Sequence, residues 1–531
     1  MATATRAVPM TYSRPTHNPW AIALTVTLAT FMEVLDTSIA NVSLPHIAGG
    51  LSASQDEATW VLTSYLVSNA VVLPVSGWIS DRIGRKRFYM SCVFLFTVSS
   101  FLCGFAPTLP MLIFFRILQG AGGGGLAPSE QAILADTFPP KKRGMAFAVY
   151  GMAVVLAPAI GPTLGGFITD NYSWRWIFYI NVPVGILSLM LTNIMVEDPP
   201  PMAEVRRKSR FIPVDYIGLG LVAVGLGCLQ VVLDKGQEDD WFGSHFITAF
   251  TITCAVSLIA FIIWESRQRY PIVNLRLFRI RTFAVANVLM FLLGIVLFGT
   301  TVLIPLYLQS LMGYTAQKAG EVLSPGAVVI IFLMPLVGWL VAKVDARYLI
   351  ALGFLTTSLA LLHMTNLYLG IDFRTAVMFR VYQAAGLAFL FVPINTISYV
   401  GVPPDQNNQV SGLMNLSRNL GGSVGISLVT TLLARRAQLH QNNLVSNTYT
   451  SNPSFRNMVD GLTQQLTTRG VIPSEATQQA YGRIYATLGR QASVLAYIDT
   501  IKLLAVICLC LVPLVFIMRK NKPGRGPAAA H

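Results

Sequence analysis

Long apolar runs, separated by short polar or basic stretches, repeat along the whole chain. Each run has about the 20 residues that a helix needs to cross the hydrocarbon core of a bilayer. Backbone groups in lipid must find hydrogen-bond partners within their own segment, so runs of this length predict helices. Fourteen spans are predicted, near 20–44, 58–79, 88–106, 111–131, 144–168, 176–196, 215–234, 246–264, 283–308, 319–342, 348–370, 375–400, 409–433 and 500–518. The pattern therefore predicts an all-α polytopic membrane protein.

The composition agrees with this pattern. The 531 residues are 53% hydrophobic and 12% charged, whereas a soluble domain carries about 25% charged residues. The first apolar run is too long for the apolar region of a secretory signal, and no small-residue cleavage site follows it. We therefore expect no cleavable signal peptide.

The net charge of +14 is distributed unevenly between the loops. Basic residues crowd alternate loops, as at 81–87, 141–143, 206–210 and 519–525, whereas the loop at 234–242 is acidic. Lysine and arginine accumulate in cytoplasmic loops, so the alternation predicts that both termini are cytoplasmic. The basic loops suit anionic lipid headgroups of the bilayer, and we expect no nucleic-acid partner.

Motifs for enzyme chemistry are weak in this chain. The six cysteines lie in predicted spans without zinc-type spacing, so we expect neither a disulfide framework nor a metal site. "GAGGGG" at 120–125 follows no strand, and no P-loop motif occurs, so no nucleotide cofactor is expected. "GGSVG" at 421–425 would suit a membrane hydrolase built on Ser423, with His363 as the only histidine well inside a span. We consider an enzyme the weakest of the alternatives.

One short element occurs twice. Arg116 and Gln119 lie three residues apart in the fourth span, and Arg380 and Gln383 repeat this spacing in the twelfth. If the seventh and eighth spans are set aside, each element falls in the fourth helix of a six-helix unit. Two parallel six-helix halves are a known transporter architecture, with the substrate site between them.

The repeat divides the chain into segments. We predict a cytoplasmic tail at 1–19, an N-terminal bundle at 20–196, an inserted two-helix hairpin at 215–266, a C-terminal bundle at 283–518 and a tail at 519–531. The C-terminal bundle includes a polar loop at 434–499, which the parity of the spans places outside and which contains helical, partly amphipathic stretches. A loop of this length is usually functional or disordered.

Two acidic residues lie in the first span. Glu33 and Asp36 share one helical face, and a carboxylate in the membrane costs at least about 2.5–3.5 kcal/mol. Helical rise places Asp36 and Arg116 about 6–7 Å to the same side of the membrane centre, so the two can pair. One guanidinium cannot fully neutralise two carboxylates. We therefore expect at least one of Glu33 and Asp36, beside Arg116, to bind and release a proton. A static ion pair beside a neutral Glu33 is the alternative.

The second arginine has no such partner in the sequence. The ninth span contains no acid, and Glu321 is the only plausible partner for Arg380. A packing or cavity-lining role is therefore favoured for Arg380. The residues proposed to line a substrate cavity are Met32, Tyr65, Asn69, Gln119, Arg380 and Phe391.

Two stretches suggest conformational control. "GWISDRIGRKR" at 77–87 joins the second and third spans, and Asp81 amid its positive charge suggests a specific salt bridge. "GMAVVLAPAIGPTLGG" in the fifth span is rich in small residues and proline, which allow close packing and bending. The proposed gating residues are Gly77, Asp81, Arg82, Gly84, Arg85, Pro158, Gly161, Pro162 and Gly165.

Together these stretches resemble the major facilitator superfamily, and within it the fourteen-span drug:proton antiporters. "GWISDRIGRKR" is similar to the family's loop 2–3 motif, "RILQGAGGGG" to its proton-transfer motif, "GPTLGG" to its antiporter motif and "LDTSIANVSLP" to its first-helix motif. "SWRWIFYINVPVG", "PIVNLRLF" and the long loop before the last span look similar to the EmrB-type multidrug exporters of that family.

The resemblance implies a proton-coupled multidrug efflux pump in the bacterial inner membrane, joined by a periplasmic adaptor to an outer-membrane channel. It implies proton coupling by Asp36 and Arg116, inner gating by Asp81 and Arg82, and control of the fifth helix by Pro158 and its neighbouring glycines. Glu33 departs from the family pattern, in which a neutral residue is expected. An exporter of a single natural product, fatty acid or siderophore, and a non-transporting sensor or scaffold, remain the alternatives.

Overall fold

The computed structural model describes residues 17–198, 214–446, 448–449, 451–518 and 520, and within them the ordered elements are all helices. The α-helices are α1 (Pro19–Gly50), α2 (Gln55–Ile83), α3 (Arg85–Phe105), α4 (Leu109–Gly123), α5 (Leu126–Thr137), α6 (Arg143–Asn171), α7 (Trp176–Tyr179), α8 (Asn181–Met195), α10 (Tyr216–Lys235), α11 (His245–Arg267), α12 (Arg281–Ser310), α13 (Ala316–Val341), α14 (Ala346–Met364), α15 (Phe373–Ser398), α16 (Asn407–Val445), α17 (Pro453–Thr468) and α18 (Pro473–Val515). Three short 3₁₀ turns join them, η1 (Trp241–Gly243), η2 (Leu275–Arg279) and η3 (Pro404–Gln406). Residues 1–16 of the tail predicted at 1–19, the basic stretch at 206–210, and residues 519 and 521–531 of the tail predicted at 519–531 lie outside the described residues.

Among the described helices, 13 candidate spans are long and apolar enough to cross a membrane. In this count α4 and α5 form one span broken near Gly124, and α7 and α8 form another. The remaining predicted span, at 409–433, forms the N-terminal part of α16, which is not among these 13 helices. Its polar side chains, among them Asn415 and Arg418, are buried against other helices. The predicted all-α polytopic membrane fold is confirmed.

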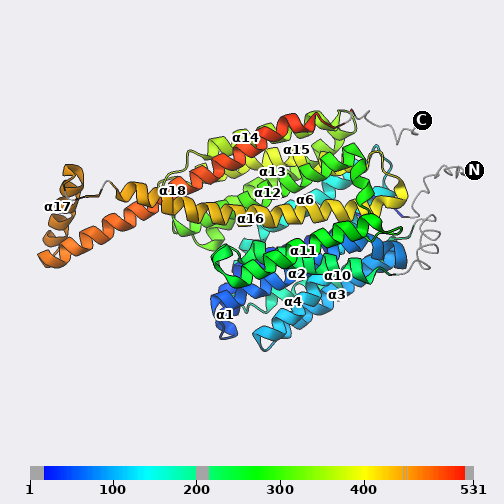
Figure 1. Cartoon of the computed structure of the whole chain (residues 1–531), viewed down its shortest axis with the longest axis horizontal. Coiled ribbons are helices and arrows are strands. Elements are labelled where there is room, and N and C mark those ends of the chain that lie inside the picture. Colours follow the sequence, from blue (N-terminus) through cyan, green and yellow to red (C-terminus); the bar gives the residue numbers. More distant parts are fainter. Residues whose placement is uncertain (1–16, 199–213, 447, 450, 519, 521–531) are drawn as a thin grey trace, which may run out of the picture.

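The spanning helices pack as two groups that meet along a central interface (Figure 1). On one side α1 packs on α6 and α8, and α4 packs on α2 and α3. On the other side α12 packs on α16, and α14 and α13 pack on α15. The groups meet where α6 contacts α13 and where α16 contacts α2 and α5. The residue boundaries of two six-helix bundles remain a prediction from the sequence.

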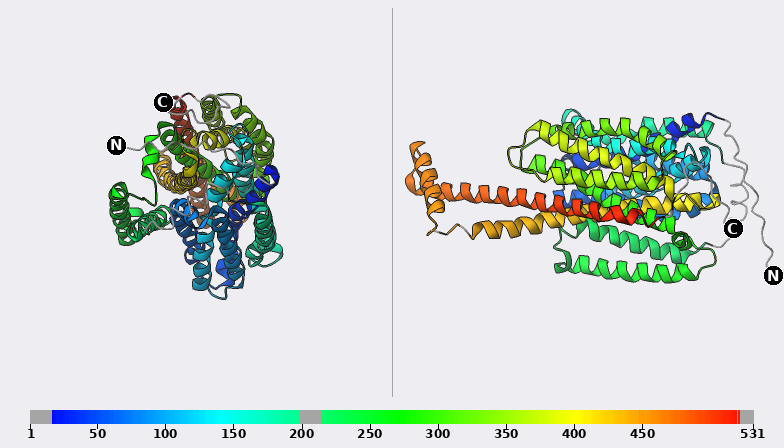
Figure 2. Two further views of the ribbon diagram at one scale, coloured as in Figure 1. Left: turned by 90° about the vertical axis from the view of Figure 1, so that its right-hand side faces the viewer. Right: turned by 90° about the horizontal axis from the view of Figure 1, so that it is seen from above.

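Helices α10 and α11 form a hairpin on the outside of this bundle (Figure 2). Helix α10 packs on α2, and the partner that α11 contacts most is α10. Ser423 of α16 donates a hydrogen bond to Gln230 of α10 at 2.9 Å, so the hairpin also contacts the second group of helices.

Backbone contact between the two groups depends on glycine. A Cβ added at Gly144 of α6 would lie 2.6 Å from the carbonyl oxygen of Gly338 of α13, and a Cβ at Gly338 would lie 2.8 Å from that of Gly144. Such distances exclude any side chain at either position. Small residues therefore let α6 and α13 cross with their backbones in contact.

A helical arm extends from one end of the bundle (Figure 2). It consists of the C-terminal part of α16, the N-terminal part of α18, and α17, which packs on α18. Asp499 of α18 joins the two long helices at its base, because its Oδ2 lies 2.9 Å from Nε2 of His440 on α16. Leu466 of α17 packs with Ala476 and Ala480 of α18. The segment predicted as a polar loop at 434–499 is thus largely a helical extension of two spanning helices.

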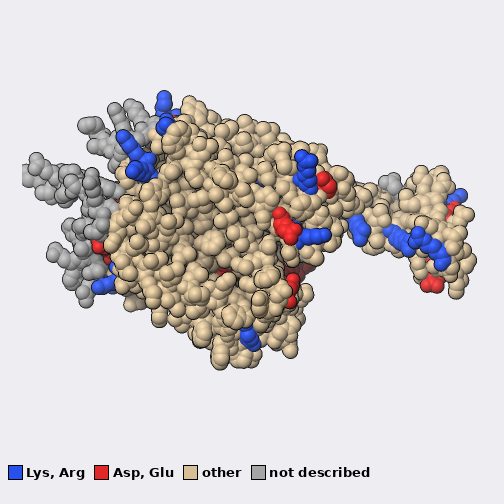
Figure 3. Space-filling view, turned by 180° about the vertical axis from the view of Figure 1, so that it is seen from behind, with Lys and Arg blue, Asp and Glu red and all other residues tan. Residues whose placement is uncertain are grey.

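Charged side chains are sparse over the middle of the bundle on the face seen in Figure 3. They gather toward the two ends of the bundle and along the arm. A surface with few exposed charges is what contact with lipid requires, because a charged side chain is costly in hydrocarbon.

Candidate functional site: buried charges between the helices

Asp36 of the first predicted span and Arg116 of the fourth predicted span are in contact inside the bundle. Arg116 Nη1 donates to Asp36 Oδ2 at 2.6 Å, and the two side chains are 0% and 1% exposed. Asp36 Oδ1 accepts two further hydrogen bonds, from Gln119 Nε2 at 3.0 Å and from Asn181 Nδ2 at 2.6 Å. The predicted contact between Asp36 and Arg116 is confirmed. Asn181 lies within the span predicted at 176–196, and it was not predicted as a site residue because a single uncharged polar side chain in an apolar span carries no distinguishing signal.

Arg116 is held by groups from several helices. Its Nε donates to the Val61 carbonyl oxygen of α2 at 3.1 Å, and its Nη1 donates to Gln119 at 2.9 Å. The guanidinium carbon lies 4.3 Å from the centre of the Tyr65 ring, at a distance favourable for a cation–π contact. The charge of Asp36 is therefore matched by a fixed cation, and hydrogen bonds satisfy both of its oxygens.

Glu33 has a different environment, although it lies three residues from Asp36. Its Oε1 accepts hydrogen bonds from the Tyr65 hydroxyl at 3.1 Å and from Asn69 Nδ2 at 3.3 Å. Both donors are neutral, and within the described part of the chain no cation lies within salt-bridge distance of Glu33. Glu33 is 9% exposed. A carboxyl group that is buried among neutral donors can be accommodated with or without its proton.

A third buried acid was not predicted from the sequence. Glu130 of α5 is 0% exposed and accepts a hydrogen bond from the Thr27 hydroxyl of α1 at 2.5 Å. It falls at the polar end of the predicted fourth span, where an acid looks like part of a loop. The break at Gly124 and Gly125 starts a new helix there, which keeps Glu130 inside the bundle.

A cation from the other group of helices faces both unpaired acids. Arg418 of α16 is 5% exposed and interacts electrostatically with Glu33 and with Glu130. Its Nη1 donates to the Tyr150 hydroxyl of α6 at 2.6 Å. Arg418 was not predicted as a site residue, because the span predicted at 409–433 has many polar residues around it.

A chain of buried amides and hydroxyls crosses the same interface. The Tyr150 hydroxyl donates to Asn415 Oδ1 at 3.1 Å, and Asn415 Nδ2 donates to Gln131 Oε1 at 2.9 Å. Gln131 Nε2 donates in turn to Asn395 Oδ1 at 3.2 Å. These polar groups lie between α5, α6, α15 and α16, so any separation of the two helix groups must break them.

The end of the bundle opposite the arm is closed by the loop 2–3 motif. Asn408 Nδ2 of α16 donates to Asp81 Oδ1 at 2.5 Å, and Asn407 donates to Asp136 at 2.7 Å. A Cβ added at Gly77 would lie 2.9 Å from the Asn408 carbonyl oxygen, so α2 touches α16 by its backbone.

The basic residues of this motif have separate partners. Arg85 forms an ion pair with Asp136 and donates to the Ala132 carbonyl oxygen at 3.0 Å. Arg82 lies over the Trp78 ring at 5.4 Å. Gly84 ends α2 with φ +100°, a conformation that other residues rarely adopt.

The small residues of the fifth predicted span pack α6 against α1. Ser38 donates to the Pro158 carbonyl oxygen at 3.4 Å, and a Cβ at Gly161 would collide with the Ser38 side chain. A Cβ at Gly165 would lie 3.1 Å from Ile39, whereas Pro162 is half-buried. These residues contact the helix that carries Glu33 and Asp36.

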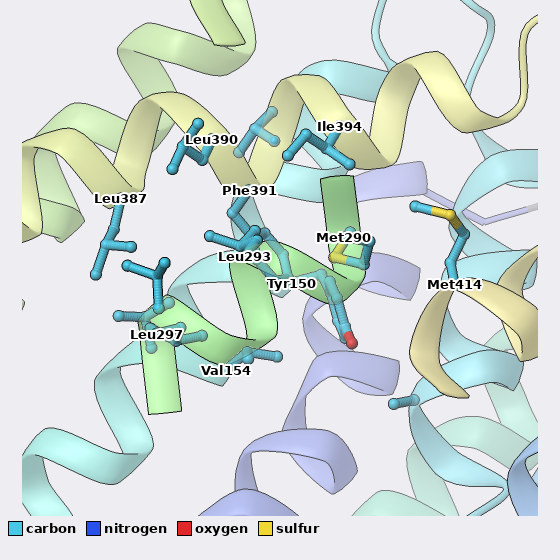
Figure 4. Close-up of a cluster of buried hydrophobic side chains, with 14 of the residues drawn as sticks. Tyr150, Val154, Met290, Leu293, Leu297, Leu387, Leu390, Phe391, Ile394 and Met414 are labelled. Atoms are coloured by element: carbon cyan, nitrogen blue, oxygen red, sulfur yellow. The ribbon is translucent and has the colours of Figure 1, made fainter. Parts of the chain in front are cut away.

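The residues proposed to line a cavity are all buried. Tyr65 and Asn69 hydrogen bond to Glu33 and Gln119 to Asp36, so they belong to the charged site, and Met32 is 1% exposed. Phe391 packs on Tyr150 at 5.6 Å between the two helix groups, in the apolar cluster of Figure 4.

Arg380 does not pair with Glu321. Arg380 donates to Gln383 at 2.8 Å and is 3% exposed, whereas Glu321 is exposed and accepts from Gln317.

The hydrolase alternative, built on Ser423 and His363, also fails on geometry. Ser423 donates to Gln230, and His363 is exposed and packs on Phe379 and Tyr382.

The arrangement of helices and buried charge can be compared with known proteins. Residues 26–426 match the family model of the Major Facilitator Superfamily. The chain belongs to this superfamily of membrane transporters. It is 40% identical to the fatty acid resistance protein FarB of Neisseria gonorrhoeae over 464 residues, which are 87% of this chain and 90% of FarB. It is 35% identical to the multidrug export protein EmrB of Escherichia coli strain K12 over 526 residues, which are 98% of this chain and 100% of EmrB.

A solved structure supports the fold at low sequence identity. The proton:xylose symporter XylE is 15% identical, with a TM-score of 0.59 over 93% of this chain and 96% of that one. At this identity the likeness shows the fold alone. The resemblance stated from the sequence motifs is confirmed, and the roles of the individual site residues stay predictions.

Proposed function

We propose that this transporter exports amphipathic toxic compounds in exchange for protons, by alternating access between the two helix groups. The observation that carries the proposal is the contrast between Asp36 and Glu33. Asp36 is neutralised by Arg116, whereas Glu33 beside it has only neutral hydrogen-bond donors. Glu33 is therefore the better candidate for the proton-binding group, with Asp36 and Arg116 as its fixed electrostatic surroundings.

The cross-interface contacts supply a coupling route. Arg418 attracts ionised Glu33 from α16, and Asn69, which donates to Glu33, accepts a hydrogen bond from Asn419 of α16 at 3.4 Å. When Glu33 binds a proton, the attraction to Arg418 disappears and the two groups of helices separate more easily. Inward movement of one proton releases about 2.3 kcal/mol per 100 mV of membrane potential, which is the energy available to drive export.

The test is dye efflux from proteoliposomes under an imposed pH gradient. We expect efflux from the wild type and none from Glu33→Gln, which mimics a permanently protonated residue and keeps its size. Asp36→Asn should weaken efflux by disturbing Arg116. Dye binding without a gradient should survive in Glu33→Gln. Equal efflux from Glu33→Gln and the wild type would show that Glu33 is not the proton-binding residue. Loss of efflux in Asp36→Asn alone would identify Asp36 as that residue.

A narrower substrate is the second candidate. The 40% identity to a fatty acid resistance protein supports export of fatty acids as the alternative to export of a broad set of drugs. Competition separates the two candidates, because a long-chain fatty acid should block dye efflux if it uses the same route. Absence of gradient-driven transport for both ligand types would favour a non-transporting sensor.

We place the protein in the bacterial inner membrane with both ends of the chain in the cytoplasm, as the alternating basic loops indicate. The helical arm would then lie on the periplasmic side. The resemblance of the sequence motifs to EmrB-type exporters implies a tripartite pump, and we propose that the arm contacts a periplasmic adaptor that leads to an outer-membrane channel.

A further inference from the structure

The two helix groups contain matching polar relays that differ at one position. In the first, Arg116 Nη1 donates to Gln119 Oε1 at 2.9 Å, and Gln119 Nε2 donates to Asp36 at 3.0 Å. In the second, Arg380 Nη1 donates to Gln383 Oε1 at 2.8 Å, and Gln383 Nε2 donates to Thr300 Oγ1. Thr300 of α12 thus occupies the place that Asp36 occupies in α1.

The second relay therefore contains a buried cation without its anion. Arg380 is 3% exposed and Thr300 and Gln383 are 0% exposed, and no carboxylate of a described residue lies within 4.0 Å of the guanidinium. Arg380 Nε makes no hydrogen bond to any described residue. A buried guanidinium without a counter-charge is strongly unfavourable, and arginine stays protonated at any working pH.

Neighbouring helices are shaped around this side chain. A Cβ added at Gly326 of α13 would lie 2.8 Å from Arg380 Cγ, so glycine at this position leaves room for the arginine stem. The site therefore lies where α12, α13 and α15 meet.

The helices α12 and α15 that carry Thr300 and Arg380 also contribute to an apolar cluster (Figure 4). Leu387 lies two turns beyond Arg380 on α15, and Leu297 lies one turn before Thr300 on α12. Both leucines belong to the cluster in Figure 4, which Tyr150 and Val154 of α6 reach from the other helix group. A charged head at Arg380 and an alkyl chain along this cluster would satisfy both environments.

We propose that Arg380, Gln383 and Thr300 form a carboxylate-binding site, and that the adjoining leucines receive the alkyl part of an anionic amphiphile. A carboxylate matches the donor geometry of a guanidinium, and charge-assisted hydrogen bonds to it are stronger than neutral ones. The inference rests on the proposed export function and narrows it, because it assigns a negative charge to one class of substrate.

The test uses the full-length protein in nanodiscs, with thermal unfolding followed at increasing ligand concentration. Sodium decanoate is the anionic probe, and decyltrimethylammonium has the same alkyl chain with a positive charge. Thr300→Asp supplies an internal carboxylate at the position equivalent to Asp36, and Thr300→Ser is its matched control. We expect decanoate to stabilise the wild type and Thr300→Ser. It should bind Thr300→Asp about tenfold to a hundredfold more weakly, the loss typical of one charge-assisted hydrogen bond.

Thr300→Asp should also unfold at a higher temperature than the wild type when no ligand is added, which shows that the variant is folded. Decyltrimethylammonium should act equally on all three proteins. Equal stabilisation of the wild type and folded Thr300→Asp by decanoate would overturn the proposal, and so would the absence of stabilisation in the wild type.

Sodium acetate distinguishes the source of the carboxylate. If decanoate acts at concentrations where acetate does not, the occupant is the amphiphile, whereas equal action would identify a free small anion and overturn the substrate assignment. The assay needs no proton gradient. A wild type that binds decanoate without gradient-driven dye efflux would defeat the proposed function and leave the site standing.

Discussion

Arg116 Nη1 of α4 lies 2.6 Å from Asp36 Oδ2 of α1, and both side chains are enclosed by the protein. Arg380 has the same spacing and the same contact to a glutamine, yet that glutamine, Gln383, donates to a threonine in place of an aspartate. The two arginines therefore form a matched pair, one with and one without a carboxylate partner among the described residues, and their removal should destabilise the protein to different extents.

Arg116→Gln should destabilise the protein by about 3–5 kcal/mol, because it leaves Asp36 buried without its counter-charge. Arg380→Gln should cost far less, since it removes a charge that no carboxylate balances. Thermal or denaturant unfolding in detergent measures both. The double variant Asp36→Asn/Arg116→Gln should be more stable than the sum of its single variants implies. Strict additivity would show that the ion pair contributes no coupling energy.

Tyr65→Phe should move the pH profile of dye efflux to higher pH by roughly one unit or less. The variant deletes one hydrogen bond to ionised Glu33, and such a bond is worth about 0.5–1.5 kcal/mol. Glu33 then holds its proton more strongly. Tyr89→Phe is the matched control, because the Tyr89 hydroxyl is buried but donates to the Val26 carbonyl oxygen at 2.8 Å. Identical shifts in both variants would assign the effect to packing.

The contact between Asp36 and Arg116 could be predicted because charged residues are rare in the apolar runs. Helical rise gives the depth of each charge in the membrane, and these two lie at similar depths. The sequence could not predict that Asn181 and Gln119 complete the site, since uncharged polar residues are common in polar and apolar segments alike. Glu130 and Arg418 escaped notice for a related reason. Glu130 lies at the end of the span predicted at 111–131, and Arg418 lies among the polar residues of the span predicted at 409–433, so only packing against other helices shows that both are buried.

The arm shows a second limit of sequence reading. Residues 434–499 lack apolar runs, and their parity places them outside, but amphipathic patterns alone do not show which helices continue. The structure shows that α16 and α18 run on without a break, joined by Asp499 and His440. Helical propensity was visible in the sequence, whereas the pairing of the two extensions depends on contacts between residues far apart in the chain.

Gly165→Val should destabilise the contact between α6 and α1 by about 1–3 kcal/mol, the usual cost of overpacking. A Cβ at Gly165 would already lie 3.1 Å from Ile39 Cγ2 and 3.2 Å from its Cα. Gly166→Val is the neighbouring control, because a Cβ at Gly166 has no heavy atom within 4 Å. Efflux and thermal unfolding should both fall in the first variant and change little in the second.

Asn408→Ala should weaken the contact between α2 and α16 at the end of the bundle opposite the arm. The variant deletes the side-chain hydrogen bond that Asn408 donates to Asp81 and leaves only the backbone contact between the two helices. Distances between spin labels on the two helices at this end should become longer and more broadly distributed. Asn419→Ala removes a longer contact nearer the middle of α16, at 3.4 Å, and is the comparison. Unchanged distances in Asn408→Ala would argue against a gating role for Asp81.

Leu466→Asp tests whether the arm is needed for drug resistance of cells but not for transport by the isolated protein. Leu466 is 2% exposed and packs on Ala476 and Ala480, so a buried carboxylate there should release α17 from α18. Thr467→Asp adds the same charge at an exposed neighbouring position and should leave the arm intact. Dye efflux from proteoliposomes should be unchanged in both variants, because the arm lies outside the bundle, whereas drug resistance of whole cells should fall only in Leu466→Asp. Full resistance in Leu466→Asp, with α17 shown to be released by proteolysis, would contradict an adaptor contact through this surface.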